Sequence, residues 1–378
     1  MKYFILLLTL TFFSVNAQDT KEEEEQQSCS DAALSFPSSH FGLSFGNSKN
    51  FTGIRFNWKD CEVNSVTGIN ITFWKGKYFQ DQNVTGVSLG TFPTVANNVG
   101  ILFGLGGFVA SNNAIGINYG TAAALSKGDM TGINFSFIAT VAERKLTGIN
   151  FGGLGTVSQS DMTGLNFGGL GLVSQGAMTG INIGGLGTVA KGPLRGLNIS
   201  GLGTVSEDDI LGLTFGGLAV VSKGNLLGIN LSPVAIISGN NMLGLNFGGV
   251  ALVAEENILG LNFGGAALVS NGDVVLGLNM TLGQLKVSNT LLGINFGGYK
   301  IEAENAVGIN AAAYSVSAEN VVGAALSAYN NVDSRMTGIS IGLFNYAAEL
   351  KGVQIGILNI AGNNPGWAKI LPVINAHF

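Results

Sequence analysis

Apolar and polar residues alternate with a period of two over most of the chain. In segment 162–174, Leu165 and Phe167 fall on one face, and Asn166 and Ser174 fall on the other. This is the spacing of a β-strand, because successive side chains of a strand point to opposite sides. A helix is excluded, since the segment holds several glycines and each would cost about 1 kcal/mol relative to Ala. The pattern therefore predicts an all-β protein.

The strands belong to an internal repeat of 16 residues. Each unit contains Thr/Leu-Gly-Ile/Leu-Asn, and short breaks such as Lys191-Gly192-Pro193 carry turn-forming residues between units. The regular units have their glycine at Gly132, Gly148, Gly164, Gly180, Gly196, Gly212, Gly228, Gly244 and Gly260, and looser copies occur on both sides. Counting these copies gives about 20 units, which leaves no room for a separate catalytic domain.

Two architectures can stack such units. Folding two units about a break places Phe167 opposite Gly185 and Leu165 opposite Gly187, so that large side chains face small ones. A solenoid would instead place Phe on Phe and leave columns of bare Gly. Closing a meander also removes its exposed edges. We therefore predict an antiparallel β-meander of about 20 16-residue strand units that closes into a β-barrel, with a β-solenoid of 16-residue coils as the alternative.

One face of the repeat is apolar throughout. In a later unit it carries Leu259, Leu261, Phe263 and Val269, while the other face mixes Gly, Asn and Ser with Leu. An apolar band of this kind either fills a core or meets lipid. We expect Phe167→Asp to prevent folding in either architecture.

The N-terminal segment of the chain predicts export. Lys2, an apolar run and a small-residue site at Val15-Asn16-Ala17 resemble a secretory signal peptide over residues 1–17. We expect an acidic, disordered tail at 18–36 and a single β-repeat domain at 37–378. The only cysteines, Cys29 and Cys61, are candidates for one disulfide in an oxidising compartment, with two free thiols as the alternative.

The composition excludes a disordered chain and argues against nucleic acid as a partner. Only 11% of the residues are charged, 46% are hydrophobic, and the net charge is −5 with a pI near 5.1. This chain is too apolar to be disordered and has no basic face for nucleic acid.

Residues for enzyme chemistry are sparse. The two histidines, His40 and His377, lie at opposite ends of the chain, and no phosphate-loop motif occurs. The Gly-Gly-Leu-Gly-Thr-Val sequence has Val where a calcium-binding repeat needs Asp. We therefore predict no catalytic residue, no metal site and no cofactor.

Asparagine recurs at one position of the unit. Two interpretations stay open: a ladder of amides that hydrogen-bond to one another or to backbone, or a polar belt that lines a lumen for an amphipathic guest. The column contains Asn134, Asn150, Asn166, Asn182, Asn198, Asn230, Asn246 and Asn262, continues toward Asn310, and is interrupted by Thr214.

The last units resemble a known group of proteins. Gly338-Ile-Ser-Ile-Gly-Leu-Phe-Asn345 and Gly352-Val-Gln-Ile-Gly-Ile-Leu-Asn359 look like the Gly-Val-Gln-Ile-Gly-Leu-x-Asn repeats of uncharacterised bacterial surface-repeat proteins. The closing segment 370–378 is also similar to the way members of this group end. The resemblance implies an exported envelope protein and brings no catalytic residues.

These observations predict a non-enzymatic, exported cell-envelope protein that is associated with the outer membrane and holds membrane lipid or an apolar small molecule. The alternative is a secreted, periplasmic or surface-displayed β-solenoid that acts as an adhesin or scaffold. A hydrolase of envelope polymers is the third hypothesis, with no residues to support it.

Overall fold

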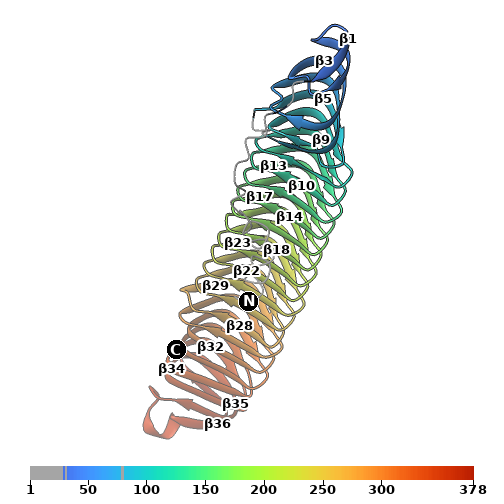
Figure 1. The fold of residues 1–378 in the computed structure, drawn as a ribbon. Coiled ribbons are helices and arrows are strands. Elements are labelled where there is room, and N and C mark those ends of the chain that lie inside the picture. Colours follow the sequence, from blue (N-terminus) through green and yellow to red (C-terminus); the bar gives the residue numbers. More distant parts are fainter. Residues whose placement is uncertain (1–28, 30–31, 78–80) are drawn as a thin grey trace, which may run out of the picture.

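The chain folds into an elongated β-solenoid of about 19 stacked coils (Figure 1). The structure is a computed structural model and describes Cys29, residues 32–77 and residues 81–378. One central coil consists of the long strand β15 (Met162–Gly168), a bend at Gly169-Leu170, the short strand β16 (Gly171–Ser174) and a turn at 175–177. With about 4.8 Å between neighbouring strands, the rod is about 90 Å long.

Long and short strands form two sets along the rod. The long strands are β7 (Asn97–Gly104), β9 (Ala114–Gly120), β11 (Met130–Ser136), β13 (Leu146–Gly152), β15, β17 (Met178–Gly184), β19 (Leu194–Ser200), β21 (Ile210–Gly216), β23 (Leu226–Ser232), β25 (Met242–Gly248), β27 (Ile258–Gly264), β29 (Val274–Thr281) and β31 (Thr290–Gly297). The short strands are β6 (Thr94–Val95), β8 (Gly107–Ala110), β10 (Ala123–Ser126), β12 (Ala139–Ala142), β14 (Gly155–Ser158), β16, β18 (Gly187–Ala190), β20 (Gly203–Ser206), β22 (Ala219–Ser222), β24 (Ala235–Ser238), β26 (Ala251–Ala254), β28 (Ala267–Ser270) and β30 (Gln284–Val287).

Both described ends of the rod are covered by an antiparallel strand. Strand β1 pairs antiparallel with β2, and β36 pairs antiparallel with β35. Each end strand thus pairs with the backbone of the terminal coil, in the way that a capping segment ends a solenoid. The end elements are β1 (Ala33–Pro37), β2 (Phe41–Gly46), β3 (Asn50–Cys61), β4 (Ser65–Lys77), β5 (Asn83–Gly90), β32 (Lys300–Ala312), β33 (Ser315–Leu326), β34 (Tyr329–Ile341), β35 (Phe344–Ala361), the short helix η1 (Gly366–Ala368) and β36 (Ile370–His377).

The predicted antiparallel meander and barrel are wrong, and the solenoid alternative is the observed fold. Equivalent residues of successive coils pair in parallel, so Phe167 lies between Phe151 and Ile183 and does not face Gly185. Phe above Phe, which was expected to clash, is accommodated in this fold. These rings point outward, where they stack on one another without competing for space in a core.

The glycine columns mark places where the coils come too close for a side chain. Gly164 has a φ of +118°, a conformation that L-residues with a Cβ rarely adopt. A Cβ at this position would also lie against the carbonyl oxygen of Gly148 in the preceding coil. The same conformation and approach recur in the equivalent glycine of each regular coil. Parallel stacking therefore requires glycine at this position of the long strand.

The interior of the rod is narrow and contains the Asn face of the repeat. Met162, Asn166 and Leu172 are each at most 2% exposed. Leu165 is 46% exposed on the outside. The predicted alternation within strands is therefore present, and it is the apolar face that points outward. Leu170 departs from the alternation, because it occupies the bend between the two strands and is 50% exposed.

The N-terminal predictions fall partly outside the described residues. Residues 1–28, which include the expected signal peptide, lie outside the described residues. Residues 33–36, which were expected to belong to the disordered tail, form part of β1. A disulfide joins Cys29 to Cys61 at the end of β3, with 5.7 Å between their Cα atoms.

Within the described part of the chain, no helix is long and apolar enough to cross a membrane.

Candidate interaction surface

The long strands expose an apolar sheet face along the rod. Position 165 of the repeat carries Ile or Leu in every regular coil, and Leu165, Leu213 and Leu261 are 46%, 42% and 52% exposed. Position 163 adds Thr in the earlier coils and Leu in the later ones, apart from Arg195. We call this outward side of the long strands the long-strand face. Each regular coil adds one Ile or Leu side chain to this face.

Aromatic rings form a second column on the long-strand face. The rings of Phe135 and Phe151 are 4.6 Å apart and inclined by 6°, and those of Phe151 and Phe167 are 4.8 Å apart and inclined by 5°. The parallel register sets this spacing, because it repeats each residue at the distance between neighbouring strands. Within the run from Phe135 to Phe167 each ring stacks on the next, and Ile183 follows Phe167 in the next coil.

The apolar surface continues around the bend that follows each long strand. The residues at this bend form a row that we call the leucine edge: Ile138, Leu154, Leu170, Leu186, Leu202, Leu218, Val234 and Val250. All of them are between 39% and 51% exposed. Beyond this edge, the short strands point Val173 and its equivalents outward, and Ile237 in this column is 39% exposed. We call that side the short-strand face.

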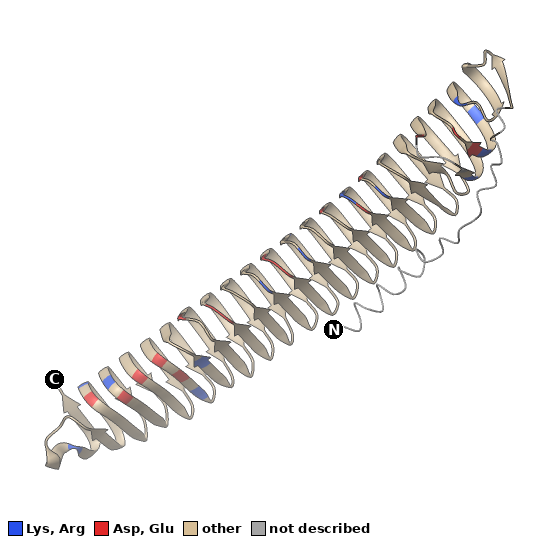
Figure 2. Ribbon diagram, turned by 60° about the vertical axis from the view of Figure 1, so that its left-hand side comes forward, with Lys and Arg blue, Asp and Glu red and all other residues tan. Residues whose placement is uncertain are grey.

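Charge in the central coils is confined to the opposite edge. Figure 2 shows the charges of these coils in a row along one side of the rod. This charged edge consists of the turns that follow the short strands, such as Glu207-Asp208-Asp209 and Glu255-Glu256, and acidic residues outnumber basic ones between 127 and 273. Arg195 is the exception in this range, because it stands on the long-strand face. Each central coil is thus mostly apolar on three sides and polar on the fourth.

No family model matches this chain, and neither do the curated proteins or the solved structures at a significant level.

The predicted Asn column lies inside the rod as a hydrogen-bonded ladder. Asn150 donates to the Oδ1 of Asn166 over 2.7 Å, and Asn166 donates to the Oδ1 of Asn182 over the same distance. The side chains do not line an open lumen, because Met and Leu columns with no exposure pack beside them. Buried and linked in this way are Asn134, Asn150, Asn166, Asn182 and Asn198, followed after Thr214 by Asn230, Asn246 and Asn262.

A buried ion pair in the N-terminal coils was not predicted from the sequence. Arg55 donates to Asp60 over 2.6 Å, and both side chains are almost fully buried. Burial raises the pKa of Asp60, but the Arg55 guanidinium and hydrogen bonds from Asn57, Asn70 and Gln82 outweigh it and bring the pKa below its usual range. The sequence does mark this site, because Arg55 stands where the inward column mostly carries Asn. Arg55 pairs in register with Asn70 of the next coil. This cluster organises the first coils.

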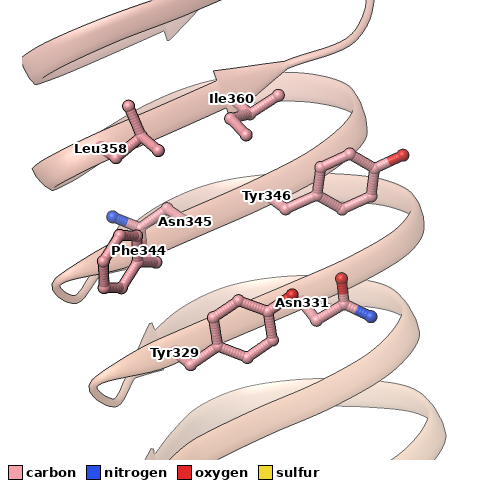
Figure 3. Close-up of a pocket in the computed structure, with 7 residues that line it drawn as sticks. All are labelled: Tyr329, Asn331, Phe344, Asn345, Tyr346, Leu358 and Ile360. Atoms are coloured by element: carbon pink, nitrogen blue, oxygen red, sulfur yellow. The ribbon is translucent and has the colours of Figure 1, made fainter.

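A shallow pocket of about 310 Å³ lies on the outside of the last coils (Figure 3). Its lining includes the aromatic rings of Tyr329 and Phe344 and the aliphatic side chains of Leu358 and Ile360. The amide of Asn345 is engaged with Asn359 and the carbonyl oxygen of Ile355. Asn331 and Tyr346 complete the lining, so the pocket is mostly apolar and extends the apolar exterior toward the C-terminus.

The residues considered for enzyme chemistry stay apart. His40 contacts Ser39 in the N-terminal coils, whereas His377 contacts Asn364 in the C-terminal strand. Cys29 and Cys61 are bonded to each other, so neither offers a thiolate to His40. Among the described residues, no three His, Cys, Asp or Glu side chains gather as metal ligands.

Proposed function

We propose that this protein is an exported, non-enzymatic scaffold of the adhesin type, displayed at the bacterial cell surface and docked there through its apolar exterior. The observation that carries the proposal is the row of Ile and Leu side chains along the central coils, which are exposed in every regular coil, as at Leu165 and Leu261, except at the half-buried Leu197. Soluble monomers rarely expose contiguous apolar patches beyond a few hundred Å², and larger ones mark interaction sites. Over the coils between Met130 and Leu285, the strip is roughly 50 Å long.

The repeat supports a scaffold rather than a reacting centre. Each coil presents nearly the same outward side chains as its neighbours, as the in-register pairs Leu165 and Ile181 or Leu245 and Leu261 illustrate. Such a surface makes many equivalent contacts along its length, which is how solenoids bind extended partners. A catalytic site would instead need one coil to differ from the rest. The resemblance of the last units to bacterial surface-repeat proteins points to the same compartment.

The proposal is tested on native cells with a membrane-impermeant amine reagent. Lys191 and Lys223 lie on the exposed charged edge, so a surface-displayed protein will be labelled on intact cells. Labelling only after lysis would contradict surface display.

A variant of the long-strand face tests docking in the same cells. We expect a chain with Ile149→Lys, Leu165→Lys and Ile181→Lys to be exported but lost to the medium. Native Arg195 shows that this face accepts a cation without loss of the fold. The matched control places three lysines on the charged edge instead, at Gln159, Gln175 and Asn271, and should stay on the cell. Equal retention of both variants would contradict docking through the apolar exterior.

A further inference from the structure

The apolar surface of the central coils wraps around the rod. It starts on the long-strand face with Leu165 and Phe167, crosses the leucine edge at Leu170, and continues on the short-strand face with Val173. The polar side chains outside this surface are those of the charged edge, represented in this coil by Gln175, and Thr163 adds one hydroxyl on the long-strand face. A partner that satisfies this surface must contact two opposite faces and the edge between them at the same time.

We propose that this partner is a lipid layer, in which the rod lies flat with the leucine edge inserted and the charged edge toward water. The inference rests on the proposed function, because it names the partner of the same apolar surface. Fluid acyl chains adapt to the shape of what they surround, so they cover both faces and the edge together. An amphipathic helix at a membrane interface divides its surface in the same way, with its apolar side buried about 5–10 Å deep.

A second copy of the chain does not fit this surface as well. Pairing through the long-strand face would cover Leu165 and its equivalents but leave the leucine edge and the Val173 column exposed. That remaining surface would recruit further copies, and contacts that do not close produce open-ended assemblies. A closed dimer therefore leaves the leucine edge and the short-strand face in water.

The charged edge decides the orientation of the rod. Glu143, Glu207 and Glu255 lie in the turns that follow short strands and so belong to this edge. If the rod crossed the bilayer, these carboxylates would lie in hydrocarbon, where each charge is costly. With the rod axis in the membrane plane, all of them stay in water. The strands, which run between the charged edge and the leucine edge, then stand along the membrane normal.

The same edge predicts which lipids are needed. Because acidic residues outnumber basic ones along it, attraction to anionic headgroups does not contribute. Binding rests on burial of apolar side chains. It should therefore occur on zwitterionic lipid and persist at high ionic strength, where attraction between exposed charges is screened.

Flotation of the purified chain with phosphatidylcholine vesicles tests the inference. We expect the protein to float with the vesicles at both 0.1 M and roughly 1 M salt. A leucine-edge variant with Leu154→Lys, Leu170→Lys and Leu186→Lys should lose at least tenfold in vesicle affinity. The charged-edge variant, with Gln159→Lys, Gln175→Lys and Asn271→Lys, should bind as the native chain does. Circular dichroism and melting establish that each variant is folded.

Depth-dependent quenching tests the orientation. Environment-sensitive probes are attached at Leu186→Cys on the leucine edge and at Gln175→Cys on the charged edge, and the vesicles carry quenchers in their acyl chains. We expect quenching of the first probe only. Quenching of both, or of neither in a bound protein, would overturn the flat orientation.

The outcomes separate this inference from the proposed function. If folded native chain does not float, the lipid inference is overturned. In that case, release of the long-strand variant from cells would leave docking intact and assign it to a protein partner or a second copy. If the native chain floats but the long-strand variant stays on cells, the docking proposal fails while lipid affinity stands.

Discussion

Asn198 donates its side-chain amide to the hydroxyl of Thr214 over 3.4 Å, whereas the other links of the inward ladder from Asn118 to Asn310 join amide to amide at 2.6–2.9 Å. The interruption has a consequence one coil further on, where the Oδ1 of Asn230 is buried without a partner. The other unpartnered ladder atoms are Oδ1 of Asn118 and Nδ2 of Asn310, at its two ends. The ladder is thus directional, and Thr214 divides it into two runs.

Replacing Thr214 by Asn should join the two runs and stabilise the protein. The new side chain would accept from Asn198 and donate to Asn230, so we expect the free energy of unfolding to rise by about 1–2 kcal/mol. Urea denaturation measures the change. Thr214→Val is the matched control, since it keeps the shape, removes the hydroxyl and should lower stability. A destabilised Thr214→Asn protein would show that the column does not act as a ladder.

Two glycines of one coil should differ sharply in their tolerance of Ala. Gly148 has a φ of +115°, and a Cβ there would lie against the carbonyl oxygen of Gly132, so Gly148→Ala should destabilise by about 2 kcal/mol or more. At Gly155, the nearest atom to a new Cβ is the oxygen of Gly171 at 3.6 Å, and Ala219 occupies the equivalent position in a later coil. Gly155→Ala should therefore be neutral or slightly stabilising. Thermal melting of both variants checks the difference.

Phe167→Asp should fold, contrary to the expectation from sequence alone. The ring is outside the rod and stacks on Phe151, so the substitution removes a ring contact worth about 1 kcal/mol and exposes the carboxylate to water. Met162→Asp, by contrast, puts a charge at a position with no exposure and should prevent folding. Solubility and cooperative melting distinguish the two. If Phe167→Asp is unfolded, the assignment of the outer face is wrong.

Acid should destabilise the N-terminal coils through Asp60. Because the folded pKa of Asp60 is lowered, its contribution is complete above the unfolded value of about 4 and is lost as pH falls through the folded value. Asp60→Asn should remove this acid step and cost about 3–5 kcal/mol at neutral pH, since it leaves the Arg55 charge buried without its partner. Hydrogen exchange of β3 and β4 between pH 6 and pH 2 follows the loss. Glu62→Gln, at an exposed ion pair, is the control and should change little.

The period of the fold was readable from the sequence, but the direction of strand pairing was not. Alternation of Leu165 and Asn166 is the same for parallel and antiparallel strands, so the 16-residue repeat predicted strands and left their pairing open. The deciding features are backbone contacts, such as the approach of Gly148 to Gly164, and these follow from the stacking itself.

The identity of the inner face was hidden for a different reason. Burial of apolar residues is the usual rule, and it would place Phe167 inside and Asn166 outside. Parallel stacking reverses the preference, because it repeats each Asn at the strand spacing and lets every amide donate to the next, as at Asn150 and Asn166. The amides can therefore be buried while hydrogen-bonded to one another, and the aromatic column stacks on the outside of the rod. The exposed apolar surface follows from this exchange.

Reaction of two engineered cysteines with a maleimide in the native, detergent-free protein tests the account most directly. Leu170 and Leu172 would share a face in one continuous strand, but the bend places Leu170 outside at 50% exposure and Leu172 inside at 0%. We predict that Leu170→Cys reacts rapidly and that Leu172→Cys is protected until the protein unfolds. Equal reactivity of the two thiols, or protection of Leu170→Cys alone, would contradict the solenoid with an apolar exterior.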